Sequence, residues 1–337
     1  MIRRIVKRFY SIERIKEETD ALIIGAGPAG LSAAIKLKQM SVETGKEVRV
    51  IVLEKGGEVG AHTLSGAVIE PSGIEALFPD WKERGAPLIT PAIKDSMKFL
   101  TEKYAISIPH PPQMNNKGNY IVSLSEVVKW LGEQAEELGV EIYPGISGNR
   151  ILYKDGQVRG VGTIDLGIDK NGNQKPTFEP GMDIEAKLTF FAEGCHGSLT
   201  KELISKYNLR ENSQFQTYGI GLKEVWEIDP QFHNEGHVIH TIGWPLTQDV
   251  YGGSFIYHAA NNQLFIGYVV GLDYRNTYLN PYKEFQVVFS FTCRDSSIIR
   301  MFLKCFKVGD APRMEQELLM KVVYNQFLNF IFQVACF

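Results

Sequence analysis

The stretch TDALIIGAGPAGLSAAIKLK, residues 19–38, decides the fold. A short apolar run stops at the turn GAGPAG, and apolar residues then recur at helical spacing. This pattern predicts a strand, a tight turn and a helix. In a dinucleotide-binding fold, Gly25 permits the turn, Gly27 lets the backbone approach a pyrophosphate, and Gly30 lets the helix pack against the strand. The helix N-terminus offers N–H groups and the positive end of its dipole to the phosphates.

An acidic residue follows the second predicted strand. Residues 48–53, VRVIVL, form an apolar run that ends at Glu54, where a carboxylate can accept hydrogen bonds from a ribose diol. A βαβ unit without a ligand would share this pattern and remains an alternative. The acid serves the ribose of NAD or FAD equally. The early position of the fingerprint and the long glycine-rich loop at residues 55–67, which can wrap a flavin, favour FAD.

The composition is that of a globular chain. Its 337 residues can hold one large or two ordinary domains, and 44% of them are hydrophobic, which suffices for a core. A net charge of -3, without a basic stripe, gives no footing for nucleic acid. The cysteines lack the close spacing that would indicate a zinc or iron–sulfur site. No apolar run reaches the roughly 18 residues of a spanning helix, so we expect peripheral or partial membrane contact at most.

The first residues are basic and free of acids. Arg3, Arg4, Lys7 and Arg8 precede any carboxylate, and the apolar residues between them can share one face of a helix. This composition is typical of a mitochondrial transit peptide, with cleavage expected between residues 10 and 11. A solvated basic start to the chain is the alternative.

The remaining sequence predicts an excursion and a second domain. Residues 78–112 are rich in proline and predict an irregular segment. Several patterns follow: a strand at 119–123, a helix from Ser125 to Gly139, strands at 140–143 and 186–192, and turns at 154–156 and 169–173. Residues 218–279 alternate apolar and polar side chains through several short strands, which predicts a mixed sheet.

Long and unusual words along the chain carry a resemblance to a known family. They are GAGPAGLSAA at 25–34, GAHTLSGA at 60–67, FPDWKERGAPL at 78–88, GEQAEELGVEIYPG at 132–145, FAEGCHG at 191–197, QTYGIGLKEVW at 216–226, HTIGWPL at 240–246 and YGGSFIYH at 251–258. In this order they resemble the electron transfer flavoprotein–ubiquinone oxidoreductase family from about residue 18 to residue 286. The resemblance implies an α/β protein: a Rossmann-like FAD-binding domain of the glutathione-reductase type, with an inserted mixed α+β quinone-binding domain.

The resemblance also implies a division of the chain. Residues 1–17 are the targeting segment, 18–77 and 113–217 the FAD-binding domain, 78–112 a membrane-associated excursion, 218–286 a partial ubiquinone-binding domain, and 287–337 a tail outside the family. It implies a flavoprotein enzyme that takes electrons from electron transfer flavoprotein and passes them to ubiquinone. The family works on the matrix side of the mitochondrial inner membrane, and its members carry a cysteine-ligated 4Fe–4S cluster.

The resemblance assigns site residues one by one. Those expected to bind FAD are Gly25, Ala26, Gly27, Pro28, Ala29, Gly30, Glu54, Lys55, His62, Thr63, Ser65, Gly66, Glu193 and Gly194. Gly252 and Gly253 match the backbone pair that the family places at the quinone, although a strand bulge or tight turn would also require glycine. No residue is expected to act as a catalytic acid or base, because electron transfer between flavin, cluster and quinone needs none.

Five other conspicuous residues are interpreted separately from the cofactor and quinone sites. Phe78 and Trp81 suit shallow membrane insertion, because aromatic side chains favour the interface, and an ordinary surface loop is the alternative. His240 and Trp244 are expected to pack in the core. Cys195 is expected to be buried and inert.

The tail after Gln286 departs from the family. If codons for residues 314–337 are chosen freely and read two bases later, one choice gives GARAINEGGLQSIPKFHFPGGLF, which resembles the family's next segment. We therefore expect a truncated chain whose tail is out of frame and poorly ordered. Neither Cys293, Cys305 nor Cys336 can be assigned to the cluster, so we expect its ligands to be absent from this chain.

Three functions follow from the sequence. The first is the FAD-dependent reductase of ubiquinone. The second is a non-catalytic, truncated flavoprotein fragment without the cluster. The third is a soluble NAD-linked dehydrogenase, which a flavin absorption spectrum would exclude.

Overall fold

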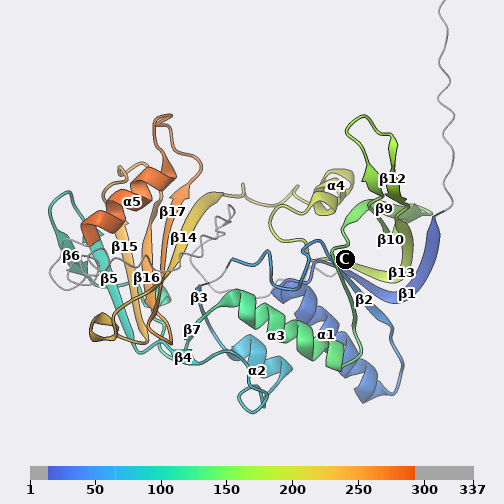
Figure 1. Ribbon diagram of the computed structural model, residues 1–337, viewed down its shortest axis with the longest axis horizontal. Helices are drawn as coiled ribbons and strands as arrows, with labels where there is room; N and C mark the ends of the chain where they lie inside the picture. Colours follow the sequence, from blue (N-terminus) through green and yellow to red (C-terminus); the bar gives the residue numbers. More distant parts are fainter. Residues whose placement is uncertain (1–13, 65, 293–337) are drawn as a thin grey trace, which may run out of the picture. The chain divides into compact units, whose positions relative to one another are not determined.

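The computed structural model describes residues 14–64 and 66–292, so the predicted cleavage point, Ser65 and most of the tail lie outside the described residues. The described chain divides into two compact units (Figure 1). Of the described residues, the first unit holds 14–61 and Leu131–Leu209, and the second holds His62–Trp130 and residues 210–292.

The first unit is built on a six-stranded sheet in the order β8-β2-β1-β13-β10-β9. Its strands are β1 (Ile15–Ile24), β2 (Val50–Glu54), β8 (Glu141–Pro144), β9 (Gly148–Lys154), β10 (Gln157–Thr163) and β13 (Met182–Phe191). The strands β8, β2, β1 and β13 are parallel, whereas β9 and β10 form an antiparallel hairpin at the edge. A parallel sheet needs apolar strands because helices cover its faces, and the apolar ends of β1 and β2 are accordingly buried.

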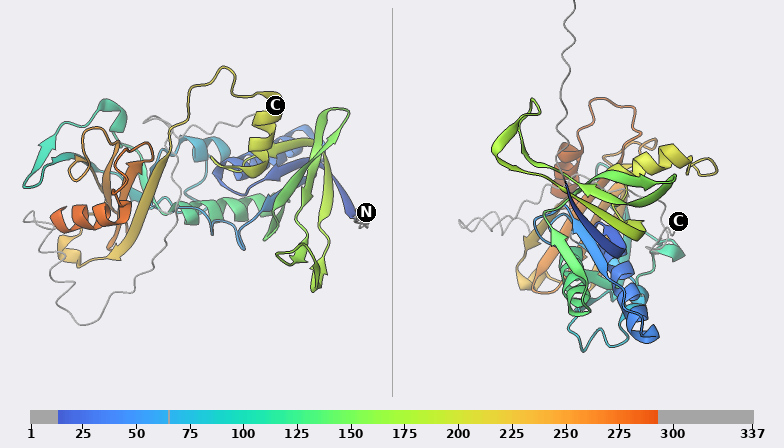
Figure 2. Two further views of the ribbon diagram at one scale, coloured as in Figure 1. Left: turned by 90° about the horizontal axis from the view of Figure 1, so that it is seen from above. Right: turned by 90° about the vertical axis from the view of Figure 1, so that its right-hand side faces the viewer.

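Helices and a hairpin complete the first unit. They are α1 (Pro28–Thr44), the second half of α3 (Leu124–Glu137), α4 (Ser198–Tyr207), and the strands β11 (Leu166–Ile168) and β12 (Gln174–Glu179), which project from the sheet (Figure 2). The turn between β9 and β10 has Asp155 and Gly156 at positive φ, as the sequence predicted for a tight hairpin. The core contains Leu22, Leu53 and Ile184.

The second unit contains another six-stranded sheet, in the order β14-β17-β16-β15-β5-β6. Its strands are β14 (Gly219–Glu227), β17 (Gln263–Gly271), β16 (Gly252–His258), β15 (His237–Gly243), β5 (Lys94–Leu100) and β6 (Ala105–Ile108). Only β15 and β5 pair in parallel within it. Helix α5 (Pro281–Thr292) lies along one face of this sheet (Figure 1), where Phe285 and Val288 join the core.

Smaller elements flank the second sheet. The strands β3 (Ala67–Ile69), β7 (Tyr120–Val122) and β4 (Thr90–Pro91) form a three-stranded sheet, and the remaining elements are α2 (Ser72–Leu77), η1 (Pro112–Met114), η2 (Pro230–Phe232) and the start of α3. This pairing explains why residues 62–77 and 113–130 belong to the second unit, although the sequence analysis assigned all of them to the FAD-binding domain.

The structure contradicts two expectations for residues 78–112: that the segment is irregular, and that Phe78 and Trp81 insert into a membrane. The segment contributes β4, β5 and β6, so it supplies the edge of the second sheet. Two of its aromatic residues are also not presented to solvent: Phe78 and Trp81 are each 3% exposed. Phe78 packs edge-on against Trp130, and Trp81 packs edge-on against Tyr120. These two side chains are therefore part of the core and cannot insert into a membrane.

Two predicted boundaries also shift. Strand β1 begins at Ile15 and pairs with β13 from Met182 onward, so residues 15–17 belong to the first sheet and not to a leader. The boundary predicted after Gln286 falls inside α5, and Val288, beyond that boundary, is 3% exposed in the core. Residues 287–292 thus continue helix α5, although the sequence analysis placed them in a tail outside the family.

Candidate cofactor site

The glycine turn joins β1 to α1 and brings three strand ends together. The amide of Gly25 donates to the carbonyl of Leu53 at 2.8 Å, and the amide of Ala192 donates to the carbonyl of Ile24 at 2.9 Å. Gly25 has φ +105°, and a Cβ there would lie 2.5 Å from the carbonyl oxygen of Ala192. Both the backbone angle and the neighbouring strand therefore require glycine at this position.

The other two glycines of the turn serve different purposes. A Cβ on Gly30 would overlap the carbonyl oxygen of Gly25, so this residue allows the helix to pack tightly on the turn. A Cβ on Gly27 would meet no heavy atom within 4 Å. The packing of the protein does not require glycine at Gly27, and the open space in front of it is what a bound pyrophosphate needs.

The N-terminus of α1 is suited to an anion. Gly27 is its N-cap residue and Pro28 opens its first turn, which contains no acidic side chain. Proline at this position lacks an N–H that would be unpaired anyway, and its fixed φ suits the helix. The amides of the first turn and the helix dipole together form an anion-binding end. The region of Pro28, Ala29 and Gly30 thus has the geometry that the sequence predicted.

Glu54 ends β2 beside the glycine turn. Its Oε2 accepts a hydrogen bond from the amide of Ala26 at 2.9 Å, and its Oε1 accepts one from the amide of Gly56 at 2.7 Å. These bonds fix the carboxylate at the strand end, and each oxygen retains a lone pair for another donor. A ribose diol supplies two such donors. The adjacent Lys55 is exposed.

Glu193 belongs to the second strand-to-helix junction. Its carboxylate accepts hydrogen bonds from the amide of Thr200 at 2.7 Å, the Thr200 hydroxyl at 2.7 Å and the amide of Leu199 at 3.3 Å. It therefore caps α4 with its side chain, and only its backbone, close to Gly25, faces the glycine turn. The sequence did not identify Thr200; a hydroxyl in the first turn after a glutamate-glycine junction was the available signal.

The same junction contains a residue that was predicted wrongly. Cys195 follows Gly194, which has φ +74°, and its side chain is exposed instead of buried. The left-handed conformation of Gly194 turns the chain after β13, and the thiol that follows is exposed to solvent.

The loop after β2 divides between the two units. His62 is exposed and Thr63 half-buried, and both belong to the second unit with Gly66. Gly66 has φ +81°, and a Cβ there would lie 2.7 Å from Cε and Nζ of Lys223 on β14. The first unit thus brings together Gly25, Gly27, Gly30, Glu54 and the Glu193 backbone, whereas the loop residues are placed in the second unit.

The predicted quinone pair begins β16. A Cβ on Gly252 would overlap the carbonyl oxygen of Val269 on β17, and a Cβ on Gly253 would overlap the carbonyl oxygen of Thr241 on β15. Strand packing is therefore sufficient to explain both glycines. His240 and Trp244 pack as expected. Burial lowers the pKa of His240 to about 4, its ring lies 3.0 Å from the hydroxyl of Tyr257, and Trp244 packs against the core of the second unit.

Two family models match the chain. A ubiquinone-binding domain of ETF-QO matches residues 218–302, and an NAD(P)-binding Rossmann-like domain matches residues 23–81. The first match covers β14 to β17 and α5, and the second runs from the end of β1 through α1, β2 and the loop that follows to β3 and α2. The Rossmann-like model agrees with the strand-turn-helix geometry around Gly25.

Solved structures show the same fold at low sequence identity. A geranylgeranyl bacteriochlorophyll reductase-like protein from Thermoplasma acidophilum has a TM-score of 0.58 and 14% identity, with 85% of this chain and 64% of that chain covered. A flavoprotein/dehydrogenase from Cytophaga hutchinsonii has a TM-score of 0.53 and 19% identity, with 88% and 66% covered. Together with the Rossmann-like model, they confirm the predicted α/β fold.

Curated relatives are much closer in sequence. The proteins named "electron transfer flavoprotein-ubiquinone oxidoreductase, mitochondrial" from Dictyostelium discoideum and Mus musculus are each 55% identical, over 285 and 281 residues. The matches cover 83% and 82% of this chain but 47% and 46% of those proteins, so the chain spans about half the length of its relatives. Over this matched part, the chain belongs to the electron transfer flavoprotein–ubiquinone oxidoreductase family.

Proposed function

We propose that the chain is the FAD- and ubiquinone-binding part of an oxidoreductase that passes electrons from reduced electron transfer flavoprotein to ubiquinone. The observation that carries the proposal is the 55% identity, over 83% of the chain, with relatives that bear this name. The match of residues 218–302 to the ubiquinone-binding model supports the acceptor. The named relatives support the donor.

The first unit fits FAD. The open space before Gly27 and the acid-free start of α1 suit the pyrophosphate, and the carboxylate of Glu54 suits the ribose. Bound FAD supplies a ring that takes up a pair of electrons and releases them one at a time. The chain's own part is to hold the diphosphate and ribose, while the Glu193 cap fixes the neighbouring junction. His62, Thr63, Ser65 and Gly66 are proposed to contact FAD from the loop.

The described residues do not offer ligands for the iron–sulfur cluster. Among residues 14–64 and 66–292, no group of three or more His, Cys, Asp or Glu side chains is arranged to hold a metal ion. These residues therefore do not fit a 4Fe–4S cluster. The quinone would be held in the second unit, with backbone groups of Gly252 and Gly253 as its proposed contacts.

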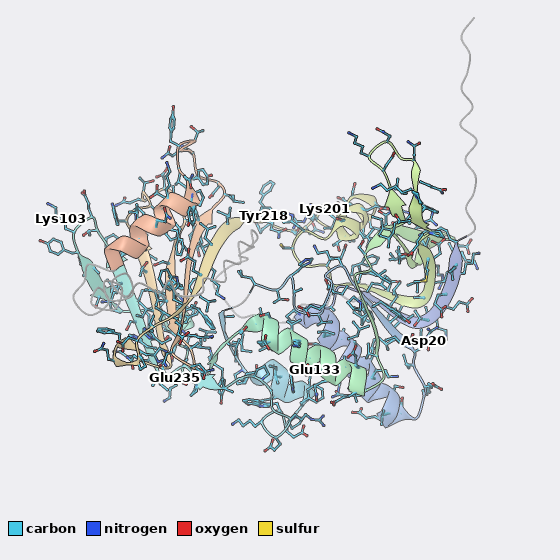
Figure 3. The ribbon with its side chains drawn as sticks, viewed as in Figure 1. Asp20, Lys103, Glu133, Lys201, Tyr218 and Glu235 are labelled. Atoms are coloured by element: carbon cyan, nitrogen blue, oxygen red, sulfur yellow. The ribbon has the colours of Figure 1, made fainter. Side chains whose placement is uncertain are left out.

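We place the chain at the matrix side of the mitochondrial inner membrane, in peripheral contact. No helix in the described ranges is long and apolar enough to cross a membrane. The hairpin of β5 and β6 offers a contact surface instead, because Phe99 and Ile106 are paired across its strands and are 39% and 50% exposed. Tyr104, 68% exposed, and Lys103 lie at its tip (Figure 3). Exposed apolar and aromatic side chains beside lysines suit an anionic lipid surface.

A spectrum and an activity assay test the function. The purified full chain should be yellow, with a flavin absorption spectrum, and should reduce a soluble ubiquinone analogue when reduced electron transfer flavoprotein is supplied. A yellow chain without quinone reduction would instead support the second candidate, a non-catalytic flavoprotein fragment without the cluster, for which residues 14–64 and 66–292 offer no group of ligands. A colourless chain that binds NAD would overturn the FAD proposal.

Vesicle flotation tests the membrane contact separately. The full chain should float with vesicles that contain cardiolipin, and the double substitution of Phe99→Ser and Ile106→Ser should reduce flotation. Leu166→Ser and Ile168→Ser form the matched control, because these side chains are 52% and 43% exposed on a hairpin of the first unit. Equal flotation of all three proteins would contradict the assignment to β5 and β6.

A further inference from the structure

Three histidines of the second unit gather where the turn before β15 meets the end of β16. The ring of His258 lies 5.3 Å from the ring of His233 and 5.8 Å from that of His237, between centroids, and the second pair is stacked. His258 is 6% exposed. Neither the cofactor site nor the proposed quinone contacts use these residues.

The hydrogen bonds of the cluster fix its protonation. The backbone amide of Asn234 donates to Nδ1 of His258 at 3.1 Å, so this nitrogen carries no proton. The side-chain amide nitrogen of Asn234 lies 3.4 Å from Nδ1 of His237, whose Nε2 lies 2.8 Å from the hydroxyl of Ser96. Asn234 therefore bridges two neutral imidazoles, and both contacts need an unprotonated nitrogen.

The same turn attaches β5 to the rest of the sheet. The amide of Gly236 donates to the carbonyl of His258 at 2.9 Å, and the carbonyl of Gly236 accepts from the amide of Ile93 at 2.9 Å and of Lys94 at 3.3 Å. The parallel pairing of β5 with β15 starts here, at His237 opposite Lys94. A change in the turn therefore reaches the β5–β6 hairpin directly.

We propose that His237 and His258, with Asn234 between them, form a proton-sensitive latch that holds the β5–β6 hairpin to the second sheet. When Nδ1 of His258 gains a proton, it can no longer accept from the amide of Asn234, and two N–H groups face each other. The turn then no longer fixes the position of Gly236. The hydrogen bonds from Ile93 and Lys94 to its carbonyl weaken, and β5 separates from β15 at its first residues. No co-reactant other than the proton is needed.

The charges around the latch oppose protonation in the closed state. Burial, followed by the neighbouring His233 and His237, lowers the pKa of His258 to about 3. Burial lowers the pKa of His237 to about 4; Lys94 and Lys98 add to this effect, and Asp95 acts against it. The carboxylate of Asp95 is held by the backbone and side-chain amides of Asn116, at 3.0 Å and 2.7 Å. Glu235, in the same turn, is exposed to solvent (Figure 3).

The direction of the pH effect follows from these shifts. An opened latch exposes histidines with an ordinary pKa of about 6.5, so acid favours opening below that value. Each histidine changes the opening equilibrium by up to tenfold per pH unit between about 6.5 and its lowered pKa. Two histidines acting together change it by up to about 100-fold per unit.

Hydrogen exchange of the full chain, corrected for intrinsic rates, tests the latch at pH 6.5 and 5.5. Peptides that cover β5, β6 and the turn at 233–237 should lose protection by up to about 30-fold, because each histidine with an open-state pKa of about 6.5 contributes about fivefold over this interval. Peptides from β13 in the first unit provide the internal reference. Equal loss in both sets, or no loss in either, would overturn the proposal.

A substitution tests whether the pH effect comes from the titration of His258 or from a general loss of stability. His258→Asn keeps an acceptor near the Nδ1 position but does not titrate, so the loss of protection should fall to about fivefold. His196→Asn, in the first unit, is the matched control and should leave the full loss unchanged. If the His258 variant does not fold, NMR titration of the wild-type imidazoles decides. Ordinary titration near pH 6.5 without loss of the β5 signals would overturn the latch.

Discussion

The predicted contact residues of the two units differ in what surrounds them. In the first unit, Gly27 faces open space, and Glu54 presents oxygens with spare lone pairs. In the second unit, a Cβ on Gly253 would overlap the backbone of a neighbouring strand, and Trp81 is buried. In the sequence, Gly27 and Gly253 looked equally functional, and so did Glu54 and Trp81. A glycine whose Cβ would meet only open space is available to a ligand, whereas a glycine whose Cβ would overlap a neighbouring strand is required by packing. In the same way, an exposed side chain can contact a ligand and a buried one cannot.

The largest expected effect tests the burial of the aromatic pair. Trp81→Ala should destabilise the second unit by about 3 to 5 kcal/mol, because it removes a large buried side chain and leaves a cavity. Ile93→Ala is the control, since Ile93 is 72% exposed, and it should change stability by less than about 0.5 kcal/mol. Urea denaturation measures both. If Trp81→Ala left stability unchanged but weakened vesicle binding, Trp81 would be a membrane contact after all.

The glycine pair gives the next effect. Gly253→Ala should destabilise the chain by roughly 2 to 3 kcal/mol, because the new methyl group forces β15 and β16 apart. The loss should appear in thermal unfolding without any quinone present. A variant as stable as the wild type, with a raised KM for the quinone analogue, would show instead that the glycine serves the ligand.

Lowering the pH should destabilise the second unit through the protonation of His240. Its folded-state pKa of about 4 lies below the ordinary 6.5, so its contribution is present above pH 6.5 and is lost as pH falls towards 4. At pH 5 this amounts to about 2 kcal/mol. Denaturation monitored between pH 7 and pH 5 should show the second unit weakening with a slope that His240→Gln reduces. An unchanged slope in that variant would assign the effect to other groups.

The smallest change in stability is expected at Gly27. Gly27→Ala should alter unfolding by less than about 0.5 kcal/mol, because its Cβ meets no atom. It should nevertheless weaken FAD about tenfold, which corresponds to about 1.4 kcal/mol, since the methyl group occupies the space proposed for the pyrophosphate. Calorimetric titration with FAD measures this. Unaltered FAD affinity would remove Gly27 from the site.

Local patterns predicted the parts of the molecule that depend on neighbouring residues. The strand-turn-helix around Gly25, the hairpin at Asp155 and the four strands of residues 218–279 all rest on spacing within a few positions, and the structure has them. The strand predicted at residues 186–192 forms the end of β13, and the bond from Ala192 to Ile24 joins it to the glycine turn.

The missed features depend on distant or directional contacts. Strand β5, KDSMKFL, has no clear alternation, and its partner β15 is remote in the chain, so no local signal could identify it. Whether Glu193 points to a cofactor or to α4 depends on side-chain direction, which a motif does not specify. The exposure of Cys195 likewise follows from a left-handed turn at Gly194 that the letters alone do not show.

The pairing of β5 with β15 has a consequence for how the chain is made. Ser96 and His237, which touch across this junction, are 141 residues apart, and the whole second part of the first unit lies between them. On the ribosome, β5 and β6 therefore emerge long before the strand that will hold them, and they wait with an unpaired edge while the first unit is completed. Such late, long-range pairing is slow and leaves the edge open to wrong partners, so synthesis of this chain should depend on chaperones at that stage.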